Sequence, residues 1–248
     1  RQVRGLLRGE DVLFREGDLE RWVRLIHADL EGFINIKDPI PVYIAANGPR
    51  GQQVTGELAD GWVTTLRVRR SLEPEIARIC DAARQSGRST EKPYTVALEF
   101  GCVLREGESL NSDRVMARVG PSIMPGLHAQ WEAAFGLGAN LGMRPDPEMT
   151  DAFNTYIQEY AESTGTASDR LYLDAHRGHM VFLKPDEAQF VTQEAIGRTL
   201  TGTGPEIIDK LESMEANGVD SVAISVTDPQ GARDLIEDFG REVIAKRG

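Results

Sequence analysis

A short segment near residue 47 carries the residue types best suited to binding an anion. The apolar run of residues 40–46 ends at Asn47 and Gly48, and Pro49 and Arg50 follow. Glycine permits backbone angles that other residues avoid, and proline suits the first helical position because its missing N–H needs no partner there. The free N–H groups of the first helical turn, the helix dipole and the Arg50 charge would all favour a phosphate group. The segment therefore predicts a phosphate site formed by Ala46, Asn47, Gly48, Pro49 and Arg50.

The same residues also fit an ordinary turn between a strand and a helix. A Gly-Pro pair at such a turn is common, and by itself it carries little information about ligands. Thr64 lies in the next predicted strand, residues 62–65, and we assign it to the phosphate site together with residues 46–50. Taken alone, these residues leave both interpretations open.

Glu99 is the one carboxylate in a stretch with the alternation of a strand, residues 94–104. Val96, Leu98 and Phe100 share one face of that strand, and Glu99 lies on the other. An unpaired carboxylate inside a barrel has its pKa raised by burial and can serve as an acid or a base. A buried salt bridge is the alternative, and Glu99 stays a candidate residue on the substrate side.

The densest polar cluster of the second half is His176-Arg-Gly-His179. Two histidines three residues apart can share a helix face and bind a metal, but Gly178 between them weakens a helix. No nearby carboxylate pair completes a ligand set, so the sequence predicts no metal site here. A ring nitrogen bonded to the backbone is the simpler role for each histidine.

The elements around these residues alternate between strands and helices, which is typical of a parallel sheet covered by helices. Strands are expected at 40–46, 62–65, 94–104 and 219–226, and helices at 49–58, 74–85, 205–216 and from 228 onward. In the first helix we expect Val54 and Leu58 on the inner face, and Gly56 packed closely on the sheet. Residues 105–200 break this rhythm and predict a helical and loop insertion, with helices near 112–119 and 149–162.

Two motifs carry a resemblance to a known family. Pro41-Val-Tyr-Ile-Ala-Ala-Asn-Gly-Pro49 and Gly56-Glu-Leu-Ala-Asp-Gly-Trp62 closely resemble the luciferase-like family of flavin- and deazaflavin-dependent oxidoreductases, including its methylene-tetrahydromethanopterin reductase branch. The segments 3–12, 201–208 and 218–225 are similar to later parts of the same family. The segment 3–12 looks like the helix and loop before the fifth barrel strand, and 201–208 looks like the seventh helix.

The resemblance implies an α/β fold, a (β/α)8 TIM-type barrel of the bacterial-luciferase-like kind. The first four βα units of that barrel are absent from this chain, which begins with Arg1, so we expect a part of a complete enzyme. We expect residues 1–248 to form a single domain, an incomplete barrel, with the insertion 105–200 following strand seven. Strands without neighbours expose unpaired backbone groups, so we also expect association with another chain, as a homo-oligomer.

The resemblance also implies a type of reaction and a coenzyme. Members of the family transfer hydride with FMN or with the deazaflavin coenzyme F420, and we expect one of these coenzymes, its phosphate held near Gly48 and Pro49, to act on a small organic molecule. The resemblance places His176 and His179 on the active-site side. Three alternatives remain: an FMN-dependent monooxygenase of the same family, a non-catalytic subunit that completes a barrel, and a phosphosugar aldolase or isomerase.

The amino-acid composition indicates which classes of binding partner and which cellular compartment to expect. The formal charge is −11, and basic residues are not clustered with aromatic ones, which argues against nucleic acid and anionic membranes as partners. The only cysteines, Cys80 and Cys102, are far apart, which argues against a disulfide framework or a structural zinc site. We expect a cytoplasmic protein.

Overall fold

The computed structural model describes residues 1–28, 30, 35–38, 40–65, 71–88, 91–137, 145–226 and 229–247. The chain forms two compact units. The first comprises Arg1–Thr65, Arg69–Ala97 and Asn217–Val222, and the second is built mainly from Leu98–Ala216 and Ala223–Gly248. The prediction that residues 1–248 form one domain stays a prediction.

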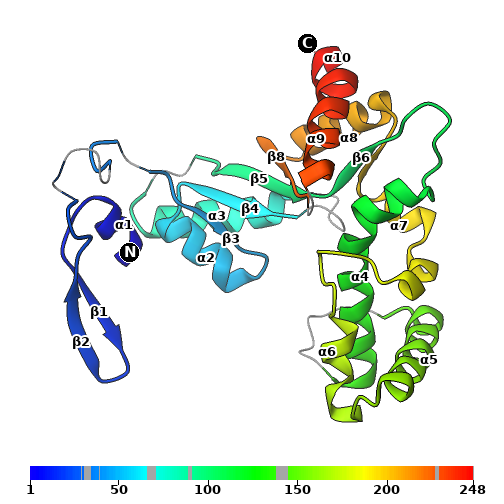
Figure 1. Cartoon of the computed structure of the whole chain (residues 1–248). Coiled ribbons are helices and arrows are strands. Elements are labelled where there is room, and N and C mark those ends of the chain that lie inside the picture. The colour runs from blue at the N-terminus through cyan, green and yellow to red at the C-terminus, as the bar shows by residue number, and fades with distance from the viewer. Residues whose placement is uncertain are drawn as a thin grey trace. The chain divides into compact units, whose positions relative to one another are not determined.

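The first unit opens with a short helix and a hairpin (Figure 1). Helix α1 (Gln2–Leu7) precedes the antiparallel strands β1 (Val12–Glu16) and β2 (Leu19–Val23), which pair from Val12 opposite Val23 to Glu16 opposite Leu19. Gly17 makes the turn with a φ of 57°, a value that suits glycine. The resemblance predicts a helix and a loop here, whereas the structure has a helix followed by a hairpin.

A parallel sheet follows, and its strand order is β3, β4, β5, β8. Strand β3 (Tyr43–Ala45) pairs in parallel with β4 (Gly61–Thr64), which pairs in parallel with β5 (Tyr94–Glu99). Helix α2 (Pro49–Leu58) connects β3 to β4, and α3 (Glu73–Gln85) lies between β4 and β5 in the chain. These bounds agree closely with the strands and helices that the sequence predicts between residues 40 and 99.

Helix α2 packs against α3 through Gly56. A Cβ built on Gly56 would lie 2.2 Å from the carbonyl oxygen of Ile79, so only glycine fits. The buried face of α2 therefore carries Gln52, Thr55 and Gly56, whereas Val54 is 36% exposed. The expectation that Val54 lies on the inner face and that Gly56 packs on the sheet is wrong, because close backbone approach to α3 turns small and polar side chains inward.

The predicted strand 94–104 is broken into two, β5 and β6. Strand β6 (Gly101–Val103) leaves the four-stranded sheet and pairs in parallel with β7 (Leu200–Gly202). The approach is close, because a Cβ on Gly101 would lie 2.4 Å from the carbonyl oxygen of Leu200. The helix predicted at 205–216 is present as α8 (Gly204–Ala216), and the residues just before it form β7, a strand that the sequence does not predict.

The remaining elements at the C-terminal end follow the predicted order. Strand β8 (Ser221–Ile224) precedes α9 (Pro229–Phe239), which continues into a π-helical turn at Gly240–Ile244 and the short α10 (Ala245–Arg247).

Helices dominate the segment between β6 and β7. Helices α4 (Asp113–Phe135) and α5 (Pro147–Thr164) begin at the capping side chains of Ser112 and Asp146. They are followed by the short helical elements η1 (Ser168–Arg170), α6 (Leu171–Ala175), η2 (Pro185–Phe190) and α7 (Gln193–Gly197). The sequence analysis ended the first helix at residue 119, but α4 continues through Pro121 and Pro125 and ends at Gly136.

The core of this unit lies where α4 and α5 meet. Trp131, Phe153 and Ile157 are completely buried in it, and the ring centroids of Trp131 and Phe153 are 5.6 Å apart. Burial of large apolar side chains of this kind supplies most of the stability of such a helical layer.

The α/β class with a parallel sheet is confirmed. Among the described residues the strands form one four-stranded and two two-stranded sheets. Closure of a barrel and the place of the insertion after strand seven stay predictions. Of the helices that the structure describes, none is long and apolar enough to cross a membrane.

Candidate functional site

The junction of β3 and α2 has the geometry that the sequence predicts for an anion site. Gly48 occupies the N-cap position of α2 in an extended conformation, φ −103° and ψ 161°, and Pro49 begins the helix. In the part of the chain that the structure describes, no side chain caps the first turn of α2, and that turn contains no acidic residue. Asn47, Gly48, Pro49 and Arg50 are exposed, so the start of α2 and the Arg50 charge face solvent.

Buried hydrogen bonds hold this junction in place. The Trp62 side chain is completely buried and donates its Nε1–H to the Ala46 carbonyl at 2.7 Å. Gln52 is also buried; its amide donates to the Asn47 carbonyl at 3.3 Å and accepts a hydrogen bond from Arg78. These contacts fix the backbone on which a ligand would rest.

The structure brings Thr64 to the same edge of the sheet as Ala46. Ala45 pairs with Val63, and the Ala46 N–H donates to the Val63 carbonyl at 3.3 Å. Thr64 is buried at the carboxyl end of β4. Ligands of open parallel sheets bind outside the carboxyl ends of the strands, which is where Ala46 and Thr64 lie.

The far end of α2 is capped by a cation. Arg88 donates from its two terminal nitrogens to the carbonyl oxygens of Gly56 at 2.9 Å and Ala59 at 2.7 Å. Two carbonyl groups at the end of α2 therefore bind a guanidinium, while the start of the helix has no side-chain cap among the described residues.

Glu99 lies at the carboxyl end of β5 and is 3% exposed. Its carbonyl oxygen accepts a hydrogen bond from the Ser225 N–H at 2.9 Å. Glu99 belongs to the second unit, together with His176 and His179, whereas residues 46–50 and Thr64 belong to the first. A role on the substrate side stays a prediction for all three residues.

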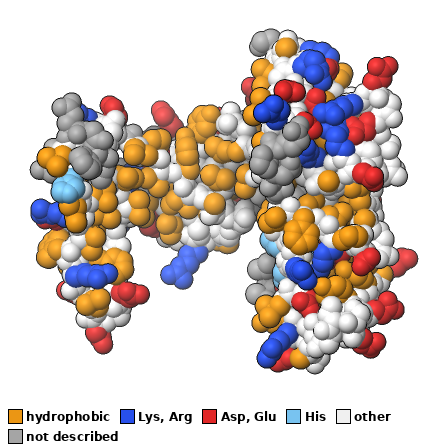
Figure 2. Space-filling view, in the orientation of Figure 1, with side chains coloured by type: hydrophobic (Ala, Val, Ile, Leu, Met, Phe, Trp, Pro, Cys, Tyr) orange, Lys and Arg blue, Asp and Glu red, His pale blue; other side chains and the backbone are white. Residues whose placement is uncertain are grey.

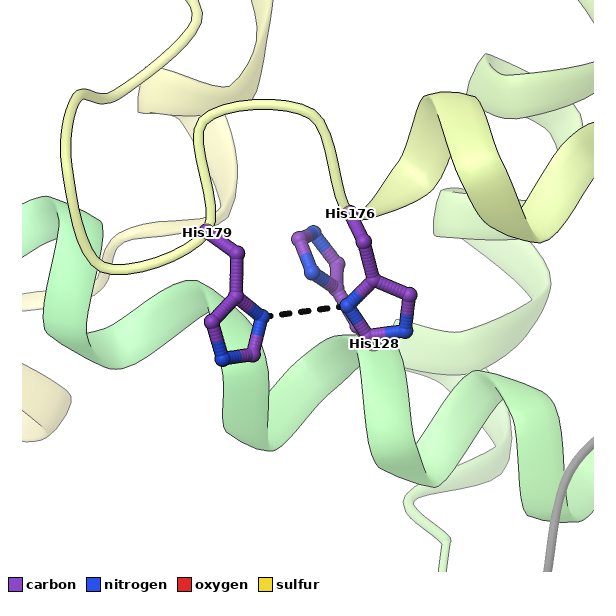
Figure 3. A group of neighbouring side chains, drawn as sticks. All are labelled: His128, His176 and His179. Atoms are coloured by element: carbon purple, nitrogen blue, oxygen red, sulfur yellow. Dashed lines mark hydrogen bonds between the residues drawn. The ribbon is translucent and has the colours of Figure 1, made fainter.

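The structure joins His176 and His179 with a third histidine (Figure 3). His176 caps the end of α6, and the turn that follows uses left-handed backbone at Gly178 and Met180. The Nδ1 atoms of His176 and His179 are 3.1 Å apart. The third ring, His128, comes from α4, and one nitrogen of each of the three rings lies within 4.8 Å of the others. We call His128, His176 and His179 the histidine cluster.

Two carboxylates contact the histidine cluster. Glu132 Oε1 lies 2.8 Å from His176 Nε2, and Glu187 Oε1 lies 3.3 Å from His128 Nε2. Lys184 pairs with Glu187 at 2.9 Å and donates to the Asp174 carbonyl at 2.8 Å. His176 thus uses both ring nitrogens on side chains, not on the backbone as expected. Burial lowers the pKa of His128, although Glu187 acts in the opposite direction.

His128 was missed by sequence reasoning. It lies 48 positions before His176, in the part of α4 beyond the two prolines where the sequence predicted no helix. A signal for it does exist, because Leu127 and His128 precede Trp131 by four and three residues and all three are buried, as on one helix face.

The fold and the β3–α2 junction together define an α/β protein with a parallel sheet and an open helix N-terminus at its carboxyl edge. Comparison of the sequence with known families makes the assignment specific. The chain belongs to the luciferase-like monooxygenase family, whose profile matches residues 1–221.

A curated relative is the F420-dependent glucose-6-phosphate dehydrogenase of Nakamurella multipartita. It is 25% identical over 186 residues, which make up 73% of this chain and 51% of the relative. The chain thus spans about half the length of the curated relative that it matches.

Solved structures share the fold. An F420-dependent secondary alcohol dehydrogenase in complex with an F420-acetone adduct is 16% identical, with a TM-score of 0.50, and the match covers 99% of this chain and 59% of that one. The oxygenating constituent of 3,6-diketocamphane monooxygenase from the CAM plasmid of Pseudomonas putida, in complex with FMN, is 14% identical, with a TM-score of 0.51. That match covers 99% of this chain and 60% of the monooxygenase.

Proposed function

We propose that this chain is part of an oxidoreductase that uses coenzyme F420 or FMN to transfer hydride to or from a small organic molecule. The observation that carries the proposal is the start of α2, where Pro49 and Arg50 are exposed, no side chain caps the helix among the described residues, and the first turn contains no acidic residue. A phosphate of either coenzyme would complete that turn.

The residues at the junction fit a phosphate group. A Cβ built on Gly48 meets nothing within 4 Å, so the space over the backbone is open. Gly51 approaches Ala46 closely, since its Cβ would lie 3.0 Å from the Ala46 Cβ. In the proposal, the backbone N–H groups of the first turn and the Arg50 guanidinium hold the phosphate. Ala46, Asn47 and Thr64 line the same edge. When bound, the coenzyme ring supplies the hydride chemistry, and the chain supplies orientation and the anchor.

Between the two coenzymes we favour F420, because the curated relative is named as an F420-dependent dehydrogenase. An FMN-dependent monooxygenase is the second candidate, since one structural neighbour of this fold is an FMN-bound monooxygenase.

A second part of the proposal concerns strand β3, which forms one edge of the four-stranded sheet. Strand β3 is the outer member of the four-stranded sheet, and Ile40, Tyr43 and Tyr94 nearby are each about half exposed. Figure 2 shows hydrophobic side chains gathered over this part of the first unit. We propose that strands outside this chain pair with β3 and complete a barrel, either in a longer form of the protein or in another subunit.

The test is a fluorescence titration of F420 and FMN into the chain and into a version extended upstream, with two substitutions at Gly48. Gly48→Asp places a carboxylate at the N-cap, where it accepts hydrogen bonds from N–H groups of the first turn and stabilises the helix by roughly a few tenths of a kcal/mol. The same carboxylate repels phosphate, so we expect at least roughly tenfold weaker coenzyme binding together with an equal or higher melting temperature.

Gly48→Ala is the matched control, because it adds a methyl group in open space without charge. We expect it to bind within about threefold of the unaltered protein. Equal coenzyme binding by the Asp and Ala variants would contradict the phosphate site, and no binding of either coenzyme to either version would favour a non-catalytic barrel subunit.

A further inference from the structure

The histidine cluster of the second unit has no role in the proposed coenzyme site. It joins the middle of α4 to the turn after α6, and the three rings point toward one another (Figure 3). Each imidazole has two nitrogens, and each of these needs a hydrogen-bond partner or a metal ion when it is buried.

Two of the three rings contact a carboxylate through the same ring nitrogen, Nε2. Nε2 of His176 faces Glu132 and Nε2 of His128 faces Glu187. An Nε2–H that donates to a carboxylate leaves Nδ1 as the lone-pair nitrogen. This is the arrangement found in metal sites, where an outer carboxylate fixes the tautomer and orientation of a histidine ligand.

The Nδ1 atom of His128 has no partner among the described residues. His128 is 1% exposed, and its Nδ1 is buried without a hydrogen bond. A buried polar atom in that state costs free energy unless a ligand or water satisfies it.

The spacing suits ligands of one ion. The Nδ1 atoms of His176 and His179 are 3.1 Å apart. Two imidazoles at zinc–nitrogen distances of about 2.0–2.1 Å in a tetrahedral site lie roughly 3.3 Å apart. A hydrogen bond between these two rings explains the same distance but leaves His128 Nδ1 unsatisfied.

We propose that His128, His176 and His179 bind a divalent transition-metal ion, with zinc(II) as the test ion, and that Glu132 and Glu187 orient two of the ligands. Imidazole nitrogens suit zinc, and three protein ligands leave one position for water or a further ligand. Lys184, a cation close to the cluster, is already paired with Glu187 at 2.9 Å. The ion links α4 to the turn at residues 176–180.

The sequence analysis assigned no metal to His176 and His179 because it found only two ligands. His128 provides the third, and Glu132 and Glu187 provide the outer carboxylates. None of these three residues is adjacent to the pair in sequence.

The test uses the purified full chain, freed of metal with a chelator and dialysed against zinc(II). Metal content measured by mass spectrometry is expected to reach one ion per chain, and cobalt(II) in place of zinc is expected to give the visible absorption of a tetrahedral site. His176→Ala and His179→Ala, both on the turn, are each expected to weaken zinc binding at least about 100-fold, whereas Glu132→Gln weakens it about 10- to 100-fold.

His27→Asn is the matched control, because His27 is the one histidine outside the cluster. His27 has a φ of 68°, and asparagine tolerates that left-handed conformation. Zinc is expected to raise the melting temperature of the unaltered chain and of His27→Asn, but not that of His176→Ala. Less than one zinc per chain at saturation, or unchanged zinc affinity in both His176→Ala and His179→Ala, would overturn the proposal.

Discussion

Trp62 and Gln52 fix the backbone of the candidate coenzyme site from inside the protein. Neither residue was part of the site predicted from sequence, which named only residues 46–50 and Thr64 in the first unit. A glutamine in the middle of a helix usually faces solvent. Gln52 is buried because α2 approaches α3 closely, and that approach depends on packing between distant segments.

The Trp62 indole makes a bond whose loss can be measured. In Trp62→Phe the Ala46 carbonyl loses its partner at 2.7 Å, so we expect a destabilisation of about 1–3 kcal/mol and weaker coenzyme binding. Urea unfolding followed by circular dichroism measures the first effect. Trp22→Phe is the control, since Trp22 is 70% exposed on the hairpin and should change stability by less than about 0.5 kcal/mol. Equal losses in the two variants would contradict the role of the indole bond.

Glu108 stabilises the folded chain in a way that is expected to be lost at low pH. Arg114 donates two hydrogen bonds to its carboxylate, one of them 2.8 Å from Nε to Oε1, and lowers the pKa of Glu108 from 4.5 to about 2. Because the folded-state pKa lies below the unfolded one, the stabilisation is complete above pH 4.5 and is lost as the pH falls toward 2. We expect Glu108→Gln to be less stable than the unaltered chain near neutral pH and the difference to shrink across that window.

Denaturant unfolding at a series of pH values measures this difference. Glu106→Gln is the control, because Glu106 is exposed two positions earlier in the same loop. A difference between Glu108→Gln and the unaltered chain that does not change with pH would show that the Arg114 contact contributes nothing through ionisation.

The elements of the first unit were predictable where local signals agree. Apolar residues before Asn47, glycine and proline at a helix start, and a second strand from Trp62 define β3, α2 and β4 from sequence alone. The length of α4 was not predictable in this way, because Pro121 and Pro125 normally end a helix and here lie inside one. The break at Phe100 depends on strand β7, nearly 100 residues later, and sequence spacing contains no trace of it.

Two helix glycines, one packed against a neighbouring helix and one in open space, are expected to respond in opposite ways to substitution by alanine. In Gly56→Ala the new Cβ meets the Ile79 carbonyl oxygen at 2.2 Å, which is backbone and cannot move cheaply, so we expect a loss of at least about 2 kcal/mol. In Gly126→Ala, inside α4, the Cβ meets nothing within 4 Å, so we expect a gain of about 0.5–1 kcal/mol. Thermal and urea unfolding of both variants measures these effects, and a loss at both positions would contradict the packing argument.

Two compact units in one chain were not predictable from the βα rhythm. Periodicity reports which residues are buried, but it does not report against which part of the chain they pack. Family membership was predictable, because two motifs of β3, α2 and β4 carried it, and the profile match over residues 1–221 confirms it. The histidine cluster was not, because three rings from two distant segments meet only in the folded chain.

Arg88 has a consequence for how fast an anion reaches α2. The guanidinium offsets the negative end of the helix at Gly56 and Ala59, while the positive end at Gly48 has no carboxylate in its first turn. The whole chain, however, carries a formal charge of −11 and repels an anion at long range. Salt screens that repulsion beyond a Debye length of about 8–10 Å but hardly affects the contact itself. Encounter with a phosphate-bearing molecule is therefore governed by ionic strength, and its residence time by the first turn of α2.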